Sequence, residues 1–234
     1  MSAEQIEGGS KPSRFRRFLD RFGDKPSHEK VEEELATLEE QAQAPAPDYR
    51  AAALNRAGDL CSQIHDRDRA LRDYGRAIDC YLEMGYYDVA ASTCRKMIEQ
   101  APEVVRARCT LAFLSLGRGL PFLPSEGVLT DASREIADYV GAARNAGQHA
   151  RAIKRLRSMS GVTDSAEIRG VIGKHLLDLG DASGADRVLQ ALSLEEAGLQ
   201  SPAGDQRERW ARVLRLSIAD QRDPGAAPSP ELEG

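Results

Sequence analysis

The chain has 234 residues, of which 41% are hydrophobic and 29% are charged, and its formal net charge is −5. This length can form one or two domains with their own core. The acidic balance argues against a nucleic-acid-binding protein, whose binding surface is normally basic. No run of about 18 apolar residues is present, so we expect no membrane-spanning helix. The first ten residues lack the basic start and apolar segment of a secretory signal, and we expect a cytoplasmic protein.

The N-terminal arm, residues 1–47, contains a short basic amphipathic segment over residues 13–23. Its apolar side chains recur at helical spacing and its arginines cover the remaining faces, which predicts a helix that binds another surface. These candidate contact residues are Phe15, Phe18, Leu19, Phe22, Arg14, Arg17 and Arg21. The helix could dock on a partner, on the protein's own body or on an anionic membrane. We favour the first two, because one short stripe binds membranes weakly.

An acidic segment follows, with six glutamates between residues 29 and 40, and predicts a second helix in the arm. The basic and acidic segments together can be interpreted as an arm for a charged partner. They can equally be two solvated helices of opposite sign.

Two long stretches without proline, 48–101 and 125–201, follow the arm. Apolar residues recur in both at three- and four-residue steps, which predicts helices over 48–117 and 131–199 with a Pro/Gly loop over 118–130 between them. One such face contains Val89, Thr93, Cys94, Met97 and Ile98. We expect a capping helix over 200–221 that contains Trp210, a disordered tail over 222–234, and an all-α fold without strands.

Only 5% of the residues are aromatic, so the core must use mainly small and aliphatic side chains, which suits closely packed helices. The cysteines stand at positions 61, 80, 94 and 109 and form none of the close pairs typical of zinc sites. We therefore expect four buried thiols, without a metal site or disulfides.

A short motif recurs where one predicted helix ends and the next begins. Gly85, Gly147 and Gly180 are each followed five residues later by an alanine, at positions 90, 152 and 185. His65 and Ala70 repeat the spacing with histidine in place of glycine. A glycine after a helical run predicts a left-handed residue that closes the helix. The alanine then allows close approach of two antiparallel helices.

With these turns, residues 50–192 resemble the tetratricopeptide repeat family, whose unit is a helix pair of about 34 residues. The residues that carry the resemblance are Gly58, Ala70, Tyr74, Ala77, Tyr81, Gly85, Ala90, Pro102, Gly147, Ala152, Gly173, Gly180 and Ala185. The family's early aromatic residue is missing from every copy and proline closes only one. The turns at residues 65 and 85 are so close in the sequence that the helix 69–84 would be the second helix of one unit and the first helix of the next.

The resemblance implies antiparallel helical hairpins stacked as a right-handed solenoid, whose concave surface binds a peptide or partner protein. An irregular helical bundle with chance echoes of the motif is the alternative. In the family, one version clamps a C-terminal carboxylate with asparagine and basic residues. Asn55 and Arg56 imitate a fragment of that set, but no matching basic residues follow.

Catalytic motifs are absent from the sequence. The four histidines are scattered, and Gly170–Lys174 lacks both the spacing and the Ser or Thr of a phosphate-binding loop. His65 and His149 lie in the predicted turns and should face solvent. We expect a non-catalytic scaffold or adaptor with no cofactor, no metal, no nucleic acid and no small-molecule substrate. The alternative is a peripheral membrane protein recruited through residues 13–23.

Overall fold

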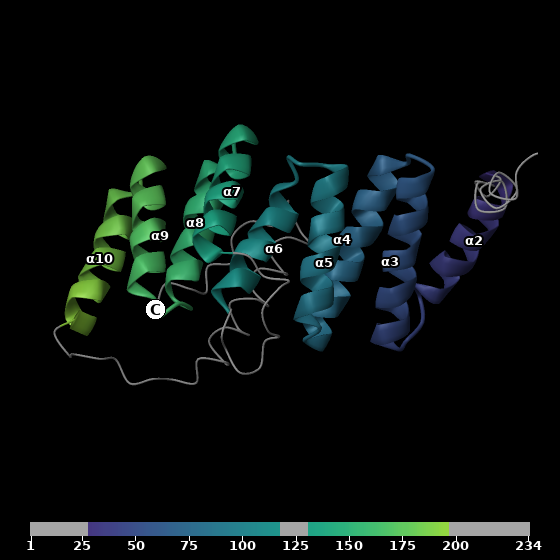
Figure 1. Ribbon diagram of the computed structural model, residues 1–234, viewed down its shortest axis with the longest axis horizontal. Coiled ribbons are helices and arrows are strands. Elements are labelled where there is room, and N and C mark those ends of the chain that lie inside the picture. Colours follow the sequence, from purple (N-terminus) through teal and green to yellow (C-terminus); the bar gives the residue numbers. More distant parts are fainter. Residues whose placement is uncertain (1–27, 118–130, 197–234) are drawn as a thin grey trace, which may run out of the picture.

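The computed structural model describes residues 28–117 and 131–196, and within these ranges every element of secondary structure is a helix (Figure 1). The described helices are α2 (His28–Gln41), α3 (Pro47–Gln63), α4 (Arg67–Met84), α5 (Tyr87–Gln100), α6 (Val105–Leu116), α7 (Ala132–Asn145), α8 (His149–Ser160), α9 (Ala166–Asp178) and α10 (Ala182–Glu196). The all-α prediction is confirmed for these residues. None of these helices combines the length and apolar character needed to cross a membrane.

Four predicted segments lie outside the described residues. They are the basic helix 13–23, the Pro/Gly loop 118–130, the capping helix 200–221 and the tail 222–234. The acidic segment of the arm is described, and it forms α2 as predicted.

The helices lie side by side in a row that begins with α2 and ends with α10 (Figure 1). Each helix packs against the next one in the sequence. One hydrophobic cluster extends along the row from Val31 in α2 to Val188 in α10. It is rich in alanine, as the low aromatic content predicts, and this permits close helix packing.

Four hairpin turns share one backbone geometry. Among the described residues, those with positive φ are His65 (62°), Gly85 (77°), Gly147 (69°) and Gly180 (87°). The residue after each of them donates its backbone N–H to the carbonyl five residues before it, at 2.8 to 2.9 Å. This is the hydrogen bond of a Schellman motif, which ends a helix through a left-handed residue. The left-handed residues predicted at the three glycines are therefore confirmed, and His65 adopts the same conformation in the glycine place.

The alanine five residues after each left-handed residue lies in the helix contact. The side chains at positions 70, 90, 152 and 185 are at most 1% exposed. α4 packs closely against both α3 and α5, as the short spacing between the first two turns requires. His65 and His149 are exposed, as expected for turn residues.

Small side chains also bring α3 and α4 together. A Cβ atom on Gly58 would lie 2.6 Å from Cδ1 and Cε1 of the Tyr74 ring, so the ring lies against the α3 backbone. The Tyr74 hydroxyl donates a hydrogen bond to Asp59 Oδ1 at 2.8 Å, which holds the ring in place. All four cysteines are buried thiols, as predicted, and burial raises the pKa of Cys61 to about 11.

One predicted apolar position is wrong. Val89 was expected on the buried face of its helix, but its side chain is 40% exposed. The neighbouring Ala90 takes the inward position in the first turn of α5, and Thr93, Cys94 and Met97 continue the buried face.

Ion pairs connect alternate helices in the first half of the row. Arg69 of α4 reaches back to α2, where it pairs with Glu32 and Glu39. Lys96 of α5 binds Asp59 of α3 at 2.8 Å. These contacts skip the helix that lies between them in the sequence.

The same pattern continues along the chain. Arg106 of α6 pairs with Asp79 of α4, and Arg95 of α5 lies 3.6 Å from the Glu135 carboxylate of α7. α6 packs on α8 and α7 packs on α9. Arg157 of α8 binds Asp181, which immediately precedes α10, at 2.6 Å. Even-numbered and odd-numbered helices therefore form two adjoining rows, which we call the even row and the odd row.

We expect Gly58→Ala to lower the free energy of unfolding by about 1–3 kcal/mol, because the added methyl group overlaps a ring held by a hydrogen bond. Gly170→Ala is the matched control, since a Cβ atom there meets nothing within 4 Å. It should stabilise helix α9 by roughly 0.5–1 kcal/mol. Urea unfolding measures both, and equal effects of the two substitutions would contradict the packing described.

The link between α8 and α10 should depend on pH. The Arg157 guanidinium bonds to Asp181, together with the Gly184 N–H, hold the pKa of this carboxyl below its ordinary value. The carboxylate therefore stabilises the fold above the unfolded pKa of about 3.9, and this stabilisation is lost as the pH falls through the lower folded pKa.

Accordingly, Asp181→Asn should lower the free energy of unfolding by about 1 kcal/mol at pH 7, and the difference from wild type should shrink in acid. Asp186→Asn removes an exposed carboxylate of α10 and should change it by less than about 0.5 kcal/mol. Chemical unfolding at a series of pH values gives the comparison. A pH-independent effect of Asp181→Asn would argue against the ion pair.

Candidate functional site

The predicted contact residues of the arm, positions 14 to 22, lie outside the described residues. The candidate sites that the structure describes therefore belong to the row of helices. Two surfaces stand out on it, one across α3 and α5 and one between α6 and α8.

The residues of the repeat motif occupy equivalent places in the first and last hairpins. In α3–α4, Gly58 faces Tyr74, and in α9–α10 Gly173 faces Leu189, whose Cδ2 atom would lie 3.8 Å from an added Cβ. In each hairpin the left-handed residue comes seven residues after Gly58 or Gly173, and the buried alanine comes twelve residues after it. The side chain that faces this glycine comes sixteen residues after it. The same local geometry is thus built twice from different side chains.

The other motif residues divide into core and surface positions. Ala77 and Tyr81 are buried in α4, at 0% and 7% exposure. Gly85, Gly147 and Gly180 are exposed in the turns, and Pro102 is exposed after the end of α5. These positions shape the hairpins and do not converge on one site.

We call the first surface the bridge face, after the side chains that connect α3 and α5. Lys96 Nζ lies 2.8 and 2.9 Å from the two carboxylate oxygens of Asp59 and donates a longer bond of 3.3 Å to Asn55 Oδ1. It also lies 5.8 Å from the centre of the Tyr74 ring, which favours a cation. Burial, with help from Asp59, raises the pKa of Tyr74, so the hydroxyl stays protonated.

Exposed residues surround this bridge. Ala52 and Arg56 continue the α3 surface at helical spacing, and Ser92 lies one turn before Lys96 on α5. Arg56 pairs with Glu34 of α2 at 3.0 Å. Asn55 and Arg56, which imitate part of a carboxylate clamp in the sequence, thus make contacts within the protein.

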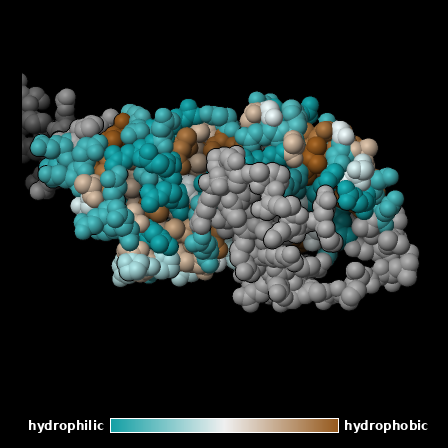
Figure 2. All heavy atoms as spheres, turned by 180° about the vertical axis from the view of Figure 1, so that it is seen from behind, coloured by the Kyte–Doolittle hydropathy of each residue, from teal (hydrophilic) through white to brown (hydrophobic). Residues whose placement is uncertain are grey.

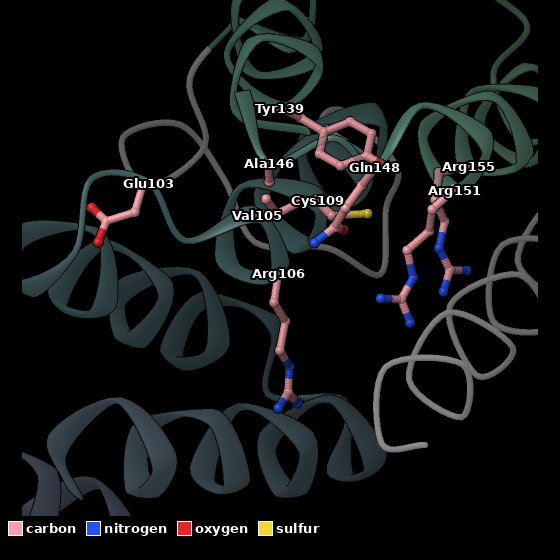
Figure 3. A pocket seen from close by; sticks show the side chains of 9 residues that line it. All are labelled: Glu103, Val105, Arg106, Cys109, Tyr139, Ala146, Gln148, Arg151 and Arg155. Carbon is pink, nitrogen blue, oxygen red and sulfur yellow. The ribbon is translucent and has the colours of Figure 1, made fainter. Parts of the chain in front are cut away.

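The second surface is a groove of about 290 Å³ between α6 and α8, and Tyr139 of α7 also contributes to its lining (Figure 3). Its lining comprises Glu103, Val105, Arg106, Cys109, Tyr139, Ala146, Gln148, Arg151 and Arg155. Arg151 and Arg155 extend side by side from α8, and Arg106 extends away from them toward α4 (Figure 3). We call this surface the α6–α8 groove.

The ionisable side chains of the groove are fixed in their protonation state or position by their neighbours. Burial raises the pKa of Tyr139, and Cys109, to which Tyr139 is hydrogen-bonded, raises it further, so that the phenol stays neutral. Arg106 is held by Asp79 and by the Gly75 carbonyl at 3.0 Å. Among the described residues, no three His, Cys, Asp or Glu side chains are grouped so as to hold a metal ion.

The described residues seen from behind are largely hydrophilic, and the hydrophobic ones among them form separate small areas (Figure 2). The large apolar side chains that are exposed in the described ranges are Tyr49, Tyr86, Val89, Leu177 and Leu189. Polar and charged groups therefore dominate what this face offers to a partner.

Sequence reasoning missed the α6–α8 groove. Its residues come from three helices and from both sides of the loop 118–130, so no local pattern joins them. One feature of the sequence could have indicated this surface. The α8 segment contains four Arg or Lys residues and no Asp or Glu, in a chain of net charge −5.

No model of a known protein family matches the chain, and no curated protein matches it significantly. The resemblance to tetratricopeptide repeats therefore stays a prediction based on the motif residues.

Proposed function

We propose that the protein is a non-catalytic, cytoplasmic adaptor whose helices form a solenoid similar to tetratricopeptide repeats, right-handed as in that family. A partner protein or peptide would bind its concave surface. The observation that carries the proposal is the repeated hairpin, in which a left-handed residue and a buried alanine recur at four turns.

The pairing of helices supports this proposal. α3–α4, α7–α8 and α9–α10 each have a left-handed residue between their two helices. If α5–α6, which is joined without such a residue, is counted as a further unit, the first helices of the units form the odd row and the second helices form the even row. In tetratricopeptide repeats the first helices line the concave surface. The bridge face, which lies on α3 and α5, would then be part of the binding surface.

The bridge face has suitable groups for such a role. Asn55, Asp59 and Lys96 are partly exposed and provide hydrogen-bond donors and acceptors that are fixed by one another. Ala52 and Ser92 are small and exposed, so the backbone of a partner can approach between the fixed polar groups. A rigid polar surface of this kind gives specificity at a low cost in side-chain entropy.

Affinity purification of the full chain with quantitative mass spectrometry tests the proposal. The double substitution Ala52→Arg and Ser92→Arg adds bulk to exposed positions of the bridge face and should remove the captured partners. Gln190→Arg is the control, because it adds the same side chain to an exposed position of α10. Circular dichroism should show the same helix content in all three proteins.

The arm distinguishes the alternatives. Phe18→Glu should leave some capture intact if the helical array binds the partner. Loss of all capture in Phe18→Glu, with full capture by the bridge-face variant, would contradict the proposal. Co-sedimentation with anionic liposomes tests the peripheral membrane alternative, and equal sedimentation of wild type and Phe18→Glu would eliminate it.

A further inference from the structure

Basic side chains outnumber acidic ones among the described residues that line the α6–α8 groove, although the chain as a whole is acidic. Among the described residues of its lining, Arg106, Arg151 and Arg155 are basic and Glu103 is acidic. Glu103 is itself bound to Arg67 of α4. Arg106 is likewise bound to Asp79 of α4, so the positive charge of the described lining depends on Arg151 and Arg155 of α8.

Helix α8 is the source of this charge. Its charged residues are all basic, and Arg157 among them is held by Asp181. Arg151 and Arg155 are four residues apart, so they lie on the same face of α8 and extend together along the groove (Figure 3). Like charges at this spacing repel each other, and a carboxylate between them offsets the repulsion.

Both arginines also interact within the chain. A guanidinium group has five N–H donors in a planar fork, which leaves room for a carboxylate in addition to internal partners. Arg155 is only 3% exposed, whereas Arg151 is partly exposed. The side-chain amide of Gln148 points into the space between the arginines of α8 and Arg106 (Figure 3).

The size and lining of the groove indicate a peptide. A volume of about 290 Å³ is at the lower end for ligand sites and admits a short segment only. Val105, Ala146 and the Tyr139 ring supply apolar contacts beside the charges. A nucleic acid would need a long basic surface, which the acidic remainder of the chain opposes.

We propose that the α6–α8 groove binds an acidic peptide segment of a partner protein, with a carboxylate held between Arg151 and Arg155. An apolar side chain of the segment lies against Val105 and Tyr139. The groove lies between even-row helices, so this is a second site beside the bridge face. The inference rests on the proposed function only in taking a peptide as the ligand.

Selection of peptides from a random display library on the immobilised full chain tests this site. Peptides selected by wild type should be enriched in Asp and Glu. Arg151→Gln should lose the enrichment and bind the selected peptides about tenfold more weakly, because charge-assisted hydrogen bonds are removed. Lys154→Gln is the matched control, since it removes the same charge from an exposed position of α8 outside the lining, and it should bind them as wild type does.

Three results would overturn the inference. They are selection of peptides without acidic enrichment, equal loss of binding in Arg151→Gln and Lys154→Gln, and displacement of the peptides by a DNA duplex at low concentration. The bridge-face variant separates the two proposals. If it loses its partners while Arg151→Gln keeps acidic peptides, only the groove inference fails. If acidic peptides bind through Arg151 while the bridge-face variant captures the same partners as wild type, the proposal that the concave surface binds a partner is wrong instead.

Discussion

The left-handed residue that ends a helix is the constraint on which the rest of this structure depends. At each of the four turns one residue at positive φ reverses the chain within a few residues. The next helix must then return along the previous one. The buried alanine five residues later lets the two helices approach closely, so local backbone geometry and packing act together. Without these turns the alanine-rich faces would have no defined partner.

Two rows of helices follow from this local rule. When every helix reverses direction, alternate helices come to lie beside each other, and charged side chains at the edge of each hairpin can reach the next one. The pairs Asp59–Lys96 and Arg157–Asp181 are examples near the two ends of the array. They determine which polar groups remain available to a partner. The bridge face and the α6–α8 groove are consequences of the stacking.

Much of the fold could be predicted from the sequence because its determinants are local. Helical periodicity, proline placement and the Gly–Ala spacing each act over a few residues, and they located the helices and the turn at His65. The ion pair between Asp59 and Lys96 joins residues 37 positions apart, and the groove joins α6 to α8 across the loop 118–130. Such contacts depend on how the hairpins stack, which no local pattern contains. The predicted burial of Val89 was wrong for a related reason, since only packing decides which residue in the first turn of a helix faces inward.

His65 gives the strictest test of the shared turn geometry, because the left-handed turn forms there without glycine. Solution NMR can measure its φ angle from backbone couplings and intraresidue NOEs, together with NOEs between the Ala70 methyl group and α3. We predict a positive φ near that of Gly85 and a methyl group in contact with α3. A negative φ at His65, or an Ala70 methyl group exposed to solvent, would contradict the claim that one hairpin geometry recurs at these four turns.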